Sequence, residues 1–236
     1  MHCFVWAFAP QPPGSPCCGL RHATCPAPRR AHLSAAAALP RLELSLQDEF
    51  DTASLPALPV LDAVEEQRVR RGECVRWQQP PDKNNPAGSG FAVQELRADV
   101  DKVWQAVSSF DGYVERISTV RSVARYDPPA DASADEPSNV CRYRFLVSRL
   151  RLVLHVRFAV DDAQRHASWQ LDKPSWVLDD STGYWRVEPV VDRPGFVRVW
   201  FCVAVRLKPL VPAFVVSLVS RLGLSKATRW LKDLGD

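Results

Sequence analysis

Alternation of apolar and polar residues, repeated from Cys141 to Leu207, constrains the fold of this chain more than any other feature. The alternation has a period of two, which indicates β-strands with one apolar face. Neighbouring antiparallel strands with this pattern form a sheet that faces water on one side only. The sequence therefore predicts a sheet with a dry face that needs a cover. Turns or irregular stretches, the longest at 172–182, separate the strand segments 141–147, 150–160, 166–171, 183–189 and 196–207.

The last part of the chain, from Leu207 to Leu234, is predicted to supply that cover as one long helix. Pro212 suits the first helical position, because its missing N–H would have no partner there. Polar residues at 217, 220 and 221 interrupt the apolar run, which is too short for the roughly 18 apolar residues of a membrane-spanning helix. A β-sandwich is the alternative, and it would leave this helix without a role. Apolar and small residues at steps of three and four form its stripe, which is Val216, Val219, Gly223, Ala227, Trp230 and Leu234.

The region before the alternating strands predicts a strand followed by two short helices. Residues 91–96 alternate as a strand, and Asp99 stands where a helix N-cap belongs, ahead of apolar residues at helical spacing. Asp111 and Gly112 end that helix, and residues 113–117 make one more turn before a strand at 120–126. The expected fold class is α+β, with a curved antiparallel sheet of about six to seven strands wrapped around the C-terminal helix.

Composition divides the chain into three parts. Residues 1–40 contain three arginines, no Asp or Glu, and many Ala and Pro, which resembles an organelle transit peptide. Their prolines argue against the amphipathic helix of a mitochondrial presequence, so a chloroplast is favoured over a mitochondrion; a disordered tail without a targeting role stays open. Residues 41–87 are predicted to be a linker with a short charged helix at 62–71 and an edge strand at 74–77. The ligand-binding domain is expected at 88–236.

Charge and cysteine content exclude several functions. Without the three arginines of residues 1–40, the 30 basic side chains of the chain balance its 27 acidic ones. No nucleic-acid footprint is therefore left. Beyond residue 40, only Cys74, Cys141 and Cys202 remain, at wide spacing, so the sequence indicates neither a disulfide framework nor a metal site. We expect buried free thiols, no cofactor and no nucleic-acid partner.

The element order and a few motifs resemble the START-like superfamily. Within it, the chain is similar to the polyketide cyclase/dehydrase and lipid-transport group, close to the coenzyme Q-binding START-domain proteins of plastids and mitochondria. The resemblance covers residues 88–234 and implies a helix-grip fold with an internal apolar cavity. It does not imply one ligand, since related domains bind sterols, phospholipids, quinones or hormones and a few catalyse cyclisation. The matching residues are Val103-Trp104, Phe110 with Tyr113, Gly183-Tyr184-Trp185, and Pro209 with Pro212.

Aromatic residues on the predicted dry face are the candidates for a ligand cavity. Around a sheet closed by one helix, they suit a hydrophobic molecule with few polar contacts, such as a prenylquinone or a membrane lipid. Each of these rings alone fits a solid core equally well. The predicted lining is Tyr143, Phe145, Phe158, Trp169, Trp185 and Phe201 from the sheet, with Val219 and Trp230 from the helix.

Basic residues on the opposite, wet face indicate contact with a membrane surface or a partner. Attraction to anionic lipid contributes on the order of 1 kcal/mol per basic residue; an ordinary solvated surface is the alternative. The loop 172–182 and the helix from Pro212 are expected to gate the cavity. The predicted wet face carries Arg142, Arg144, Arg151, Arg157 and Arg198. The residues predicted to contact a membrane or partner are Trp176, Arg221, Lys226 and Arg229.

Motifs for catalysis are missing from the sequence. It contains no H-E-x-x-H, G-x-S-x-G or C-x-x-C, and His155 and His166 are interpreted as surface residues. A cyclase would need a titratable group inside the cavity, for which Tyr143 is the candidate. The sequence therefore favours binding and transport or presentation of a hydrophobic small molecule. A polyketide cyclase/dehydrase-like enzyme and a non-catalytic organellar assembly protein are the alternatives.

Overall fold

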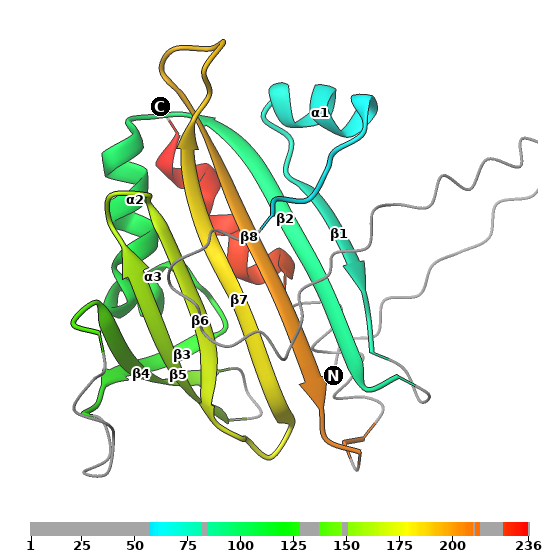
Figure 1. Ribbon diagram of the computed structural model, residues 1–236, viewed down its shortest axis with the longest axis vertical. Coiled ribbons are helices and arrows are strands. Elements are labelled where there is room, and N and C mark those ends of the chain that lie inside the picture. Colours follow the sequence, from blue (N-terminus) through cyan, green and yellow to red (C-terminus); the bar gives the residue numbers. More distant parts are fainter. Residues whose placement is uncertain are drawn as a thin grey trace, which may run out of the picture. The chain divides into compact units, whose positions relative to one another are not determined.

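One antiparallel sheet of eight strands, in the order β1-β2-β8-β7-β6-β5-β4-β3, forms the centre of the described structure (Figure 1). The computed structural model describes residues 57–81, 85–127, 137–147, 151–209, 211–212 and 224–235. The α+β class predicted from the sequence is confirmed, with one or two strands more than expected. The strands are β1 Val75–Gln79, β2 Ala87–Arg97, β3 Val120–Arg125, β4 Val140–Val147, β5 Leu152–Asp161, β6 His166–Lys173, β7 Leu178–Pro189 and β8 Phe196–Leu207.

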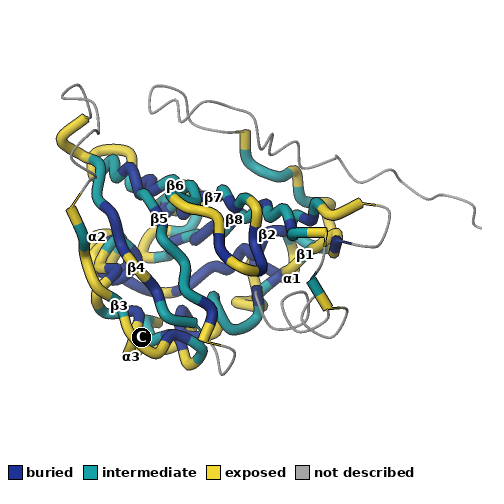
Figure 2. The backbone as a smooth tube through the Cα atoms, turned by 90° about the horizontal axis from the view of Figure 1, so that it is seen from below, coloured by how far each residue is buried: buried dark blue, intermediate teal, exposed yellow. Residues whose placement is uncertain are grey.

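The connection from β2 to β3 has to cross a whole face of the sheet, because β3 to β8 form a meander and β2 then pairs with β8. The helices of this connection, α2 Val100–Ser108, the 3₁₀ turn η1 Phe110–Gly112 and α3 Tyr113–Arg116, therefore cover that face. In Figure 1 they lie behind the sheet together with the terminal helical segment. Figure 2 shows the sheet bending from β8 and β7 round to β4 and β3. We call the covered side the concave face.

Local signals place the helix of this connection as predicted. The side chain of Asp99 accepts hydrogen bonds from the backbone N–H groups of Asp101 and Lys102, at 3.0 and 2.9 Å, and so caps α2. The helix ends at Ser108, and the chain makes the 3₁₀ turn and one further helical turn before β3. Trp104 on α2 donates to Asp162 in the β5–β6 turn at 2.8 Å, which holds the helix against the sheet.

The concave face carries the main hydrophobic core. Aromatic side chains from α2 to α3 meet those of the strands, and the terminal helical segment adds Trp230 and Leu231. Phe110 stacks on Phe158 with ring centroids 3.9 Å apart and lies edge-on to Tyr143 at 5.4 Å. This end of the concave face is filled by side chains.

The convex face is buried over part of its area, which corrects the prediction of a sheet wet on one side. Helix α1, Ala63–Arg70, and the residues before it pack on β1, β2, β7 and β8, where Tyr184, Trp200 and Cys202 are buried. The helix and the adjoining edge strand were both predicted from the sequence. Their docking was not predicted, since a pattern of period two says which residues share a face but not whether another element covers it.

The stretch 172–182, expected to be irregular, is largely strand. Within 172–182, β6 continues to Lys173 and β7 begins at Leu178, so only the turn 174–177 remains. The side chain of Ser175 accepts from the N–H of Leu178 at 2.8 Å and stabilises this tight turn. Likewise, β2 begins at Ala87 rather than at residue 91 and includes Gly88 to Gly90.

The predicted terminal helix is described only in its last part. Residues 224–228 are α-helical and continue as a 3₁₀ helix, η2 Arg229–Leu234. The rest of the predicted helix, with Val219 and Arg221, lies outside the described residues. Within the described ranges, no helix is long and apolar enough to span a membrane.

Candidate ligand cavity

An apolar cavity of about 150 Å³ lies between the concave face and the terminal helical turn. We call it the aromatic cavity. Strands β4 to β8 supply most of its wall, and α3 and the terminal helical turn close it. Five of the eight predicted cavity residues line it, namely Phe145, Phe158, Trp169, Trp185 and Phe201.

A missing side chain at Gly183 shapes the wall of this cavity. Gly183 on β7 pairs with Trp169 on β6, and a Cβ atom added at Gly183 would lie 2.3 Å from the Trp169 ring. The glycine therefore lets the indole lie flat across β7 and reach β8. There it stacks on Phe201 with ring centroids 5.3 Å apart, while Trp185 contacts Phe201 at 4.4 Å. The Gly-x-Trp motif thus builds an aromatic wall.

Two predicted cavity residues, Tyr143 and Trp230, fill core beside the cavity instead. Tyr143 is buried on the concave face, but its hydroxyl donates to the carboxylate of Asp111 at 3.3 Å. Burial and the Asp111 charge raise the pKa of this hydroxyl. Trp230 donates to the Ala227 carbonyl at 2.7 Å and packs near Trp185. The third, Val219, lies outside the described residues.

The prediction omitted several residues that also line the cavity. Three of them stood on the predicted dry face and were passed over because they are aliphatic. Tyr113 and Ile117 follow the break after α2, and the resemblance had marked Tyr113 as a motif residue. Ser181 lies in the stretch 172–182, which was not expected to be a strand. Ala227 belongs to the apolar stripe of the predicted terminal helix. The three aliphatic residues are Leu154, Val156 and Leu171.

The chemistry available in the aromatic cavity is limited. Its described lining contains no His, Cys, Asp, Glu, Lys or Arg. Tyr113 is buried and donates its hydroxyl to the Val107 carbonyl at 2.6 Å, and burial raises the pKa of that hydroxyl. Ser181 is the remaining polar side chain of the described lining. The described lining suits binding of an apolar molecule and contributes no charged acid or base.

Burial perturbs the pKa of the two described histidines and of one thiol outside the cavity. His166, expected at the surface, is 8% exposed beside Tyr184, and burial lowers its pKa to about 4. Burial also lowers the pKa of the half-buried His155 and raises that of the Cys202 thiol to about 12. Across the described ranges, no group of three or more His, Cys, Asp or Glu residues is placed to hold a metal ion.

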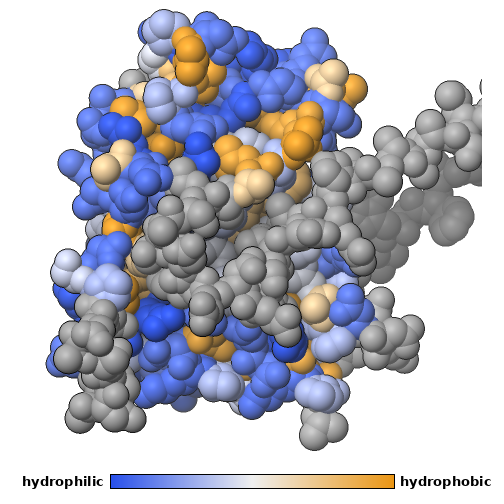
Figure 3. All heavy atoms as spheres, viewed as in Figure 1, coloured by the Kyte–Doolittle hydropathy of each residue, from blue (hydrophilic) through white to orange (hydrophobic). Residues whose placement is uncertain are grey.

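Two of the arginines predicted on the basic wet face form ion pairs within the protein. This corrects the prediction that the whole face presents free positive charge. Arg142 is 7% exposed and pairs with Asp172 at 3.5 Å. Arg198 pairs with Glu66 and Glu95, both at 2.5 Å. Figure 3 shows the side of the sheet facing the viewer of Figure 1, where the described surface is mostly hydrophilic with separate apolar patches.

The predicted contact residues lie on different elements. Trp176 is 51% exposed in the turn between β6 and β7. Arg229 is exposed and Lys226 is half-buried in the terminal helical segment. Arg221 lies outside the described residues. Contact of these side chains with a membrane or partner stays a prediction.

No family model matches the sequence, and no curated protein matches it either. Solved structures that match include the ZhuI aromatase/cyclase from Streptomyces sp. R1128, with 12% identity over 69% of this chain and 84% of that one, at a TM-score of 0.44. A START superfamily protein from Mycobacterium smegmatis matches with 16% identity over 61% of this chain and 94% of that one, at a TM-score of 0.47. At these values the matches assign neither a ligand nor an activity, and the coenzyme Q subgroup stays a prediction. The curved antiparallel sheet with helices on its concave face is itself consistent with the helix-grip fold predicted from the sequence.

Proposed function

We propose that this protein binds a hydrophobic small molecule in the aromatic cavity and transports or presents it without chemistry. One observation carries the proposal: the cavity lies under the concave face and its described lining is apolar except for Tyr113 and Ser181. Removing apolar ligand surface from water contributes about 25 cal/mol per Å². A site without charges gains its affinity mainly from this term.

A prenylquinone or a lipid is the ligand class that fits this lining best. Ring faces at Trp169, Phe201 and Phe158 accept a flat or unsaturated hydrocarbon. Ser181 supplies a hydroxyl for one polar group. A sugar or nucleotide would leave its hydroxyls or phosphates unpaired, and each such buried group costs roughly 1–3 kcal/mol. The lining therefore selects against them.

The structure offers no support for a cyclase or dehydrase among its described residues. Tyr143 was the candidate acid or base, and its hydroxyl donates to Asp111 rather than lining the cavity. General acid–base catalysis requires the group to be within hydrogen-bond reach of the substrate. We therefore propose a binding protein and not an enzyme.

A chloroplast location is proposed from the composition of residues 1–40 alone. Fusion of these residues to a fluorescent protein tests it directly: accumulation in plastids supports the proposal, whereas a mitochondrial or diffuse signal contradicts it. Trp176 is proposed to contact the membrane during loading, because exposed Trp side chains favour the membrane–water interface.

Native mass spectrometry of the purified full chain, followed by solvent extraction, tests the binding function. We expect an apolar molecule to accompany the protein at close to one per chain. An empty protein that also fails to bind added ubiquinone or phospholipid at micromolar concentration would overturn the proposal.

A filling variant tests whether the aromatic cavity is the site. Ala227 lines it from the terminal helical turn, so Ala227→Phe puts a ring into the hollow without removing a core side chain. We expect the affinity for the co-purifying ligand to fall about tenfold or more, equivalent to about 1.4 kcal/mol. Lys232→Phe adds the same ring at an exposed position of the same helical segment and should leave affinity unchanged. Equal affinity in both variants would place the site elsewhere.

A further inference from the structure

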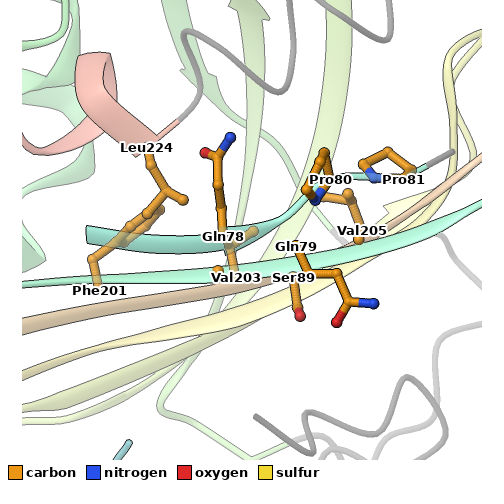
Figure 4. A pocket seen from close by; sticks show the side chains of 11 residues that line it. Gln78, Gln79, Pro80, Pro81, Ser89, Phe201, Val203, Val205 and Leu224 are labelled. Atoms are coloured by element: carbon orange, nitrogen blue, oxygen red, sulfur yellow. The ribbon is translucent and has the colours of Figure 1, made fainter. Parts of the chain in front are cut away.

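A second cavity, of about 190 Å³, lies on the same concave face near the edge formed by β1, β2 and β8 (Figure 4). We call it the edge cavity. The side chains of Val203 and Val205 on β8 line it, and Leu224 contributes to it from the terminal helical turn. The aromatic cavity lies on the other side of Phe201, toward β5, β6 and β7. Phe201 lines both.

Glycines on β2 open the edge cavity. Gly88 pairs with Val205 and Gly90 with Val203, so both glycines occupy concave positions without a side chain. A Cβ atom added at Gly90 would lie 2.6 Å from Leu224 Cδ1. The glycines therefore let Pro81, and Leu224 of the terminal helical turn, approach the backbone of β2 closely.

One helical turn covers both cavities. Leu224 lines the edge cavity, and Ala227, three residues later, lines the aromatic cavity. Residues three apart lie on the same side of a helix. In Figure 4, Leu224 and Phe201 point toward one another, so the helical turn and the ring meet at the boundary between the two cavities.

Phe201 is the wall between the cavities. Its ring packs against Trp169 and Trp185, at 5.3 and 4.4 Å between centroids. The side chain is half-buried, in contrast to Trp185 at 2% exposure. Hollow space borders it on two sides, so a change of rotamer meets less resistance than in a filled core.

The volumes indicate that the two cavities work together. Sites for small molecules usually measure about 300–1,000 Å³. Neither the 150 Å³ of the aromatic cavity nor the 190 Å³ of the edge cavity reaches that range alone. The combined volume of the two cavities lies within that range.

We propose that the two cavities are lobes of one site for a ligand with a long apolar chain, and that Phe201 is a partition that turns aside when the chain runs from one lobe into the other. This inference rests on the proposed function and narrows its ligand to a linear amphiphile. A compact molecule would need only the aromatic lobe and would leave Phe201 in place.

Fatty acids of increasing length test the partition by calorimetric titration of the full chain. We expect affinity to rise from octanoic to dodecanoic to octadecanoic acid as the chain enters the edge cavity. Phe201→Ala should raise the affinity for octadecanoic acid by about tenfold and that for octanoic acid by less than threefold. Val203→Phe fills the edge cavity alone and should abolish the gain with length while octanoic acid still binds.

Phe145→Leu is the control, because Phe145 lines the aromatic cavity only. It should weaken all three acids by a similar factor. If Val203→Phe does not fold, Val205→Leu fills the same lobe with a smaller change. Binding of all acids with no dependence on length, in the parent and the variants, overturns the partition and leaves the proposed function standing. Binding of none of them by the folded parent chain overturns the inference of a linear amphiphile, whereas the proposed function falls only if ubiquinone and phospholipid also fail to bind.

Discussion

The two faces of the same sheet are buried in different ways. On the concave face, aromatic rings such as Trp169 and Phe201 contact one another at 5.3 Å and leave a hollow beside them. On the convex face, α1 is held by directed ion pairs: Glu66 of α1 pairs with Arg198 on β8, and Arg198 also pairs with Glu95 on β2, which is 2% exposed. Apolar contact has no preferred direction, whereas each charged hydrogen bond requires its partner in one place.

This difference explains which face of the sheet can accommodate a ligand. A buried charge without its partner is costly, so a layer held by ion pairs tolerates only one packing arrangement. A ring bordered by hollow space, such as Phe201, can turn with less loss than a fully packed one, because fewer atoms lie against it. The concave face therefore combines a rigid filled end, at Phe110, with an adjustable hollow end, at Phe201. The convex cover serves to hold the sheet in shape.

The largest expected effect is a difference in unfolding free energy between a truncation at the filled end of the concave face and one at its hollow end. Phe110→Ala removes a ring that is 2% exposed and stacked on Phe158, and should lower the free energy of unfolding by about 3–5 kcal/mol. Phe201→Ala should cost less than half of that, since hollow space already borders this ring. Urea unfolding of both variants measures the difference. Equal losses would show that Phe201 is packed as tightly as Phe110.

The next effect tests the ion pairs of the convex face. Glu95→Ala leaves Arg193 without its carboxylate and removes one of two partners of Arg198, so we expect a loss of about 3 kcal/mol in the free energy of unfolding. Glu73→Ala is the matched control, because Glu73 pairs with Arg68 and Arg71 at an exposed site and should contribute below about 1 kcal/mol. A loss at Glu95 no larger than at Glu73 would mean that the buried ion pairs of the convex face contribute no more to stability than exposed ones.

The smallest effect concerns pH and the buried histidine of the convex face. Burial first and Arg186 second lower the pKa of His166 from 6.5 to about 4, while Asp161 acts weakly in the other direction. The unfolded chain therefore takes up this proton before the folded one does, and stability falls as pH drops from 6.5 toward about 4. We expect His166 to account for on the order of 1–2 kcal/mol of that fall.

His166→Gln removes this titration and should flatten the pH dependence of the unfolding free energy over the same range. Carboxylates such as Glu66, whose pKa the bond from Arg198 lowers, will still contribute to both curves. Only the difference between the two curves belongs to His166. Parallel curves would show that this imidazole is protonated as easily in the folded state as in the unfolded one.

Much of the fold followed from local patterns in the sequence. The alternation from Cys141 to Leu207 predicted the strands and the face of each cavity-lining ring, because successive side chains of a strand point to opposite sides. Asp99 marked the start of α2, since its carboxylate satisfies N–H groups that have no partner within the helix. These features depend on residues close together in the chain.

Tertiary structure alone decided what covers each face and how much space is left. The pattern put Arg198 and Cys202 on one side of β8, but only the docking of α1 made that side an interior, with Glu66 as a counter-charge. Similarly, Phe201 was predicted to line a cavity, but its place between two cavities depends on Gly183, Gly90 and Leu224 from three other elements. The period-two pattern determines to which face of the sheet each side chain of a strand points. Burial and empty volume arise from contacts between segments far apart in sequence.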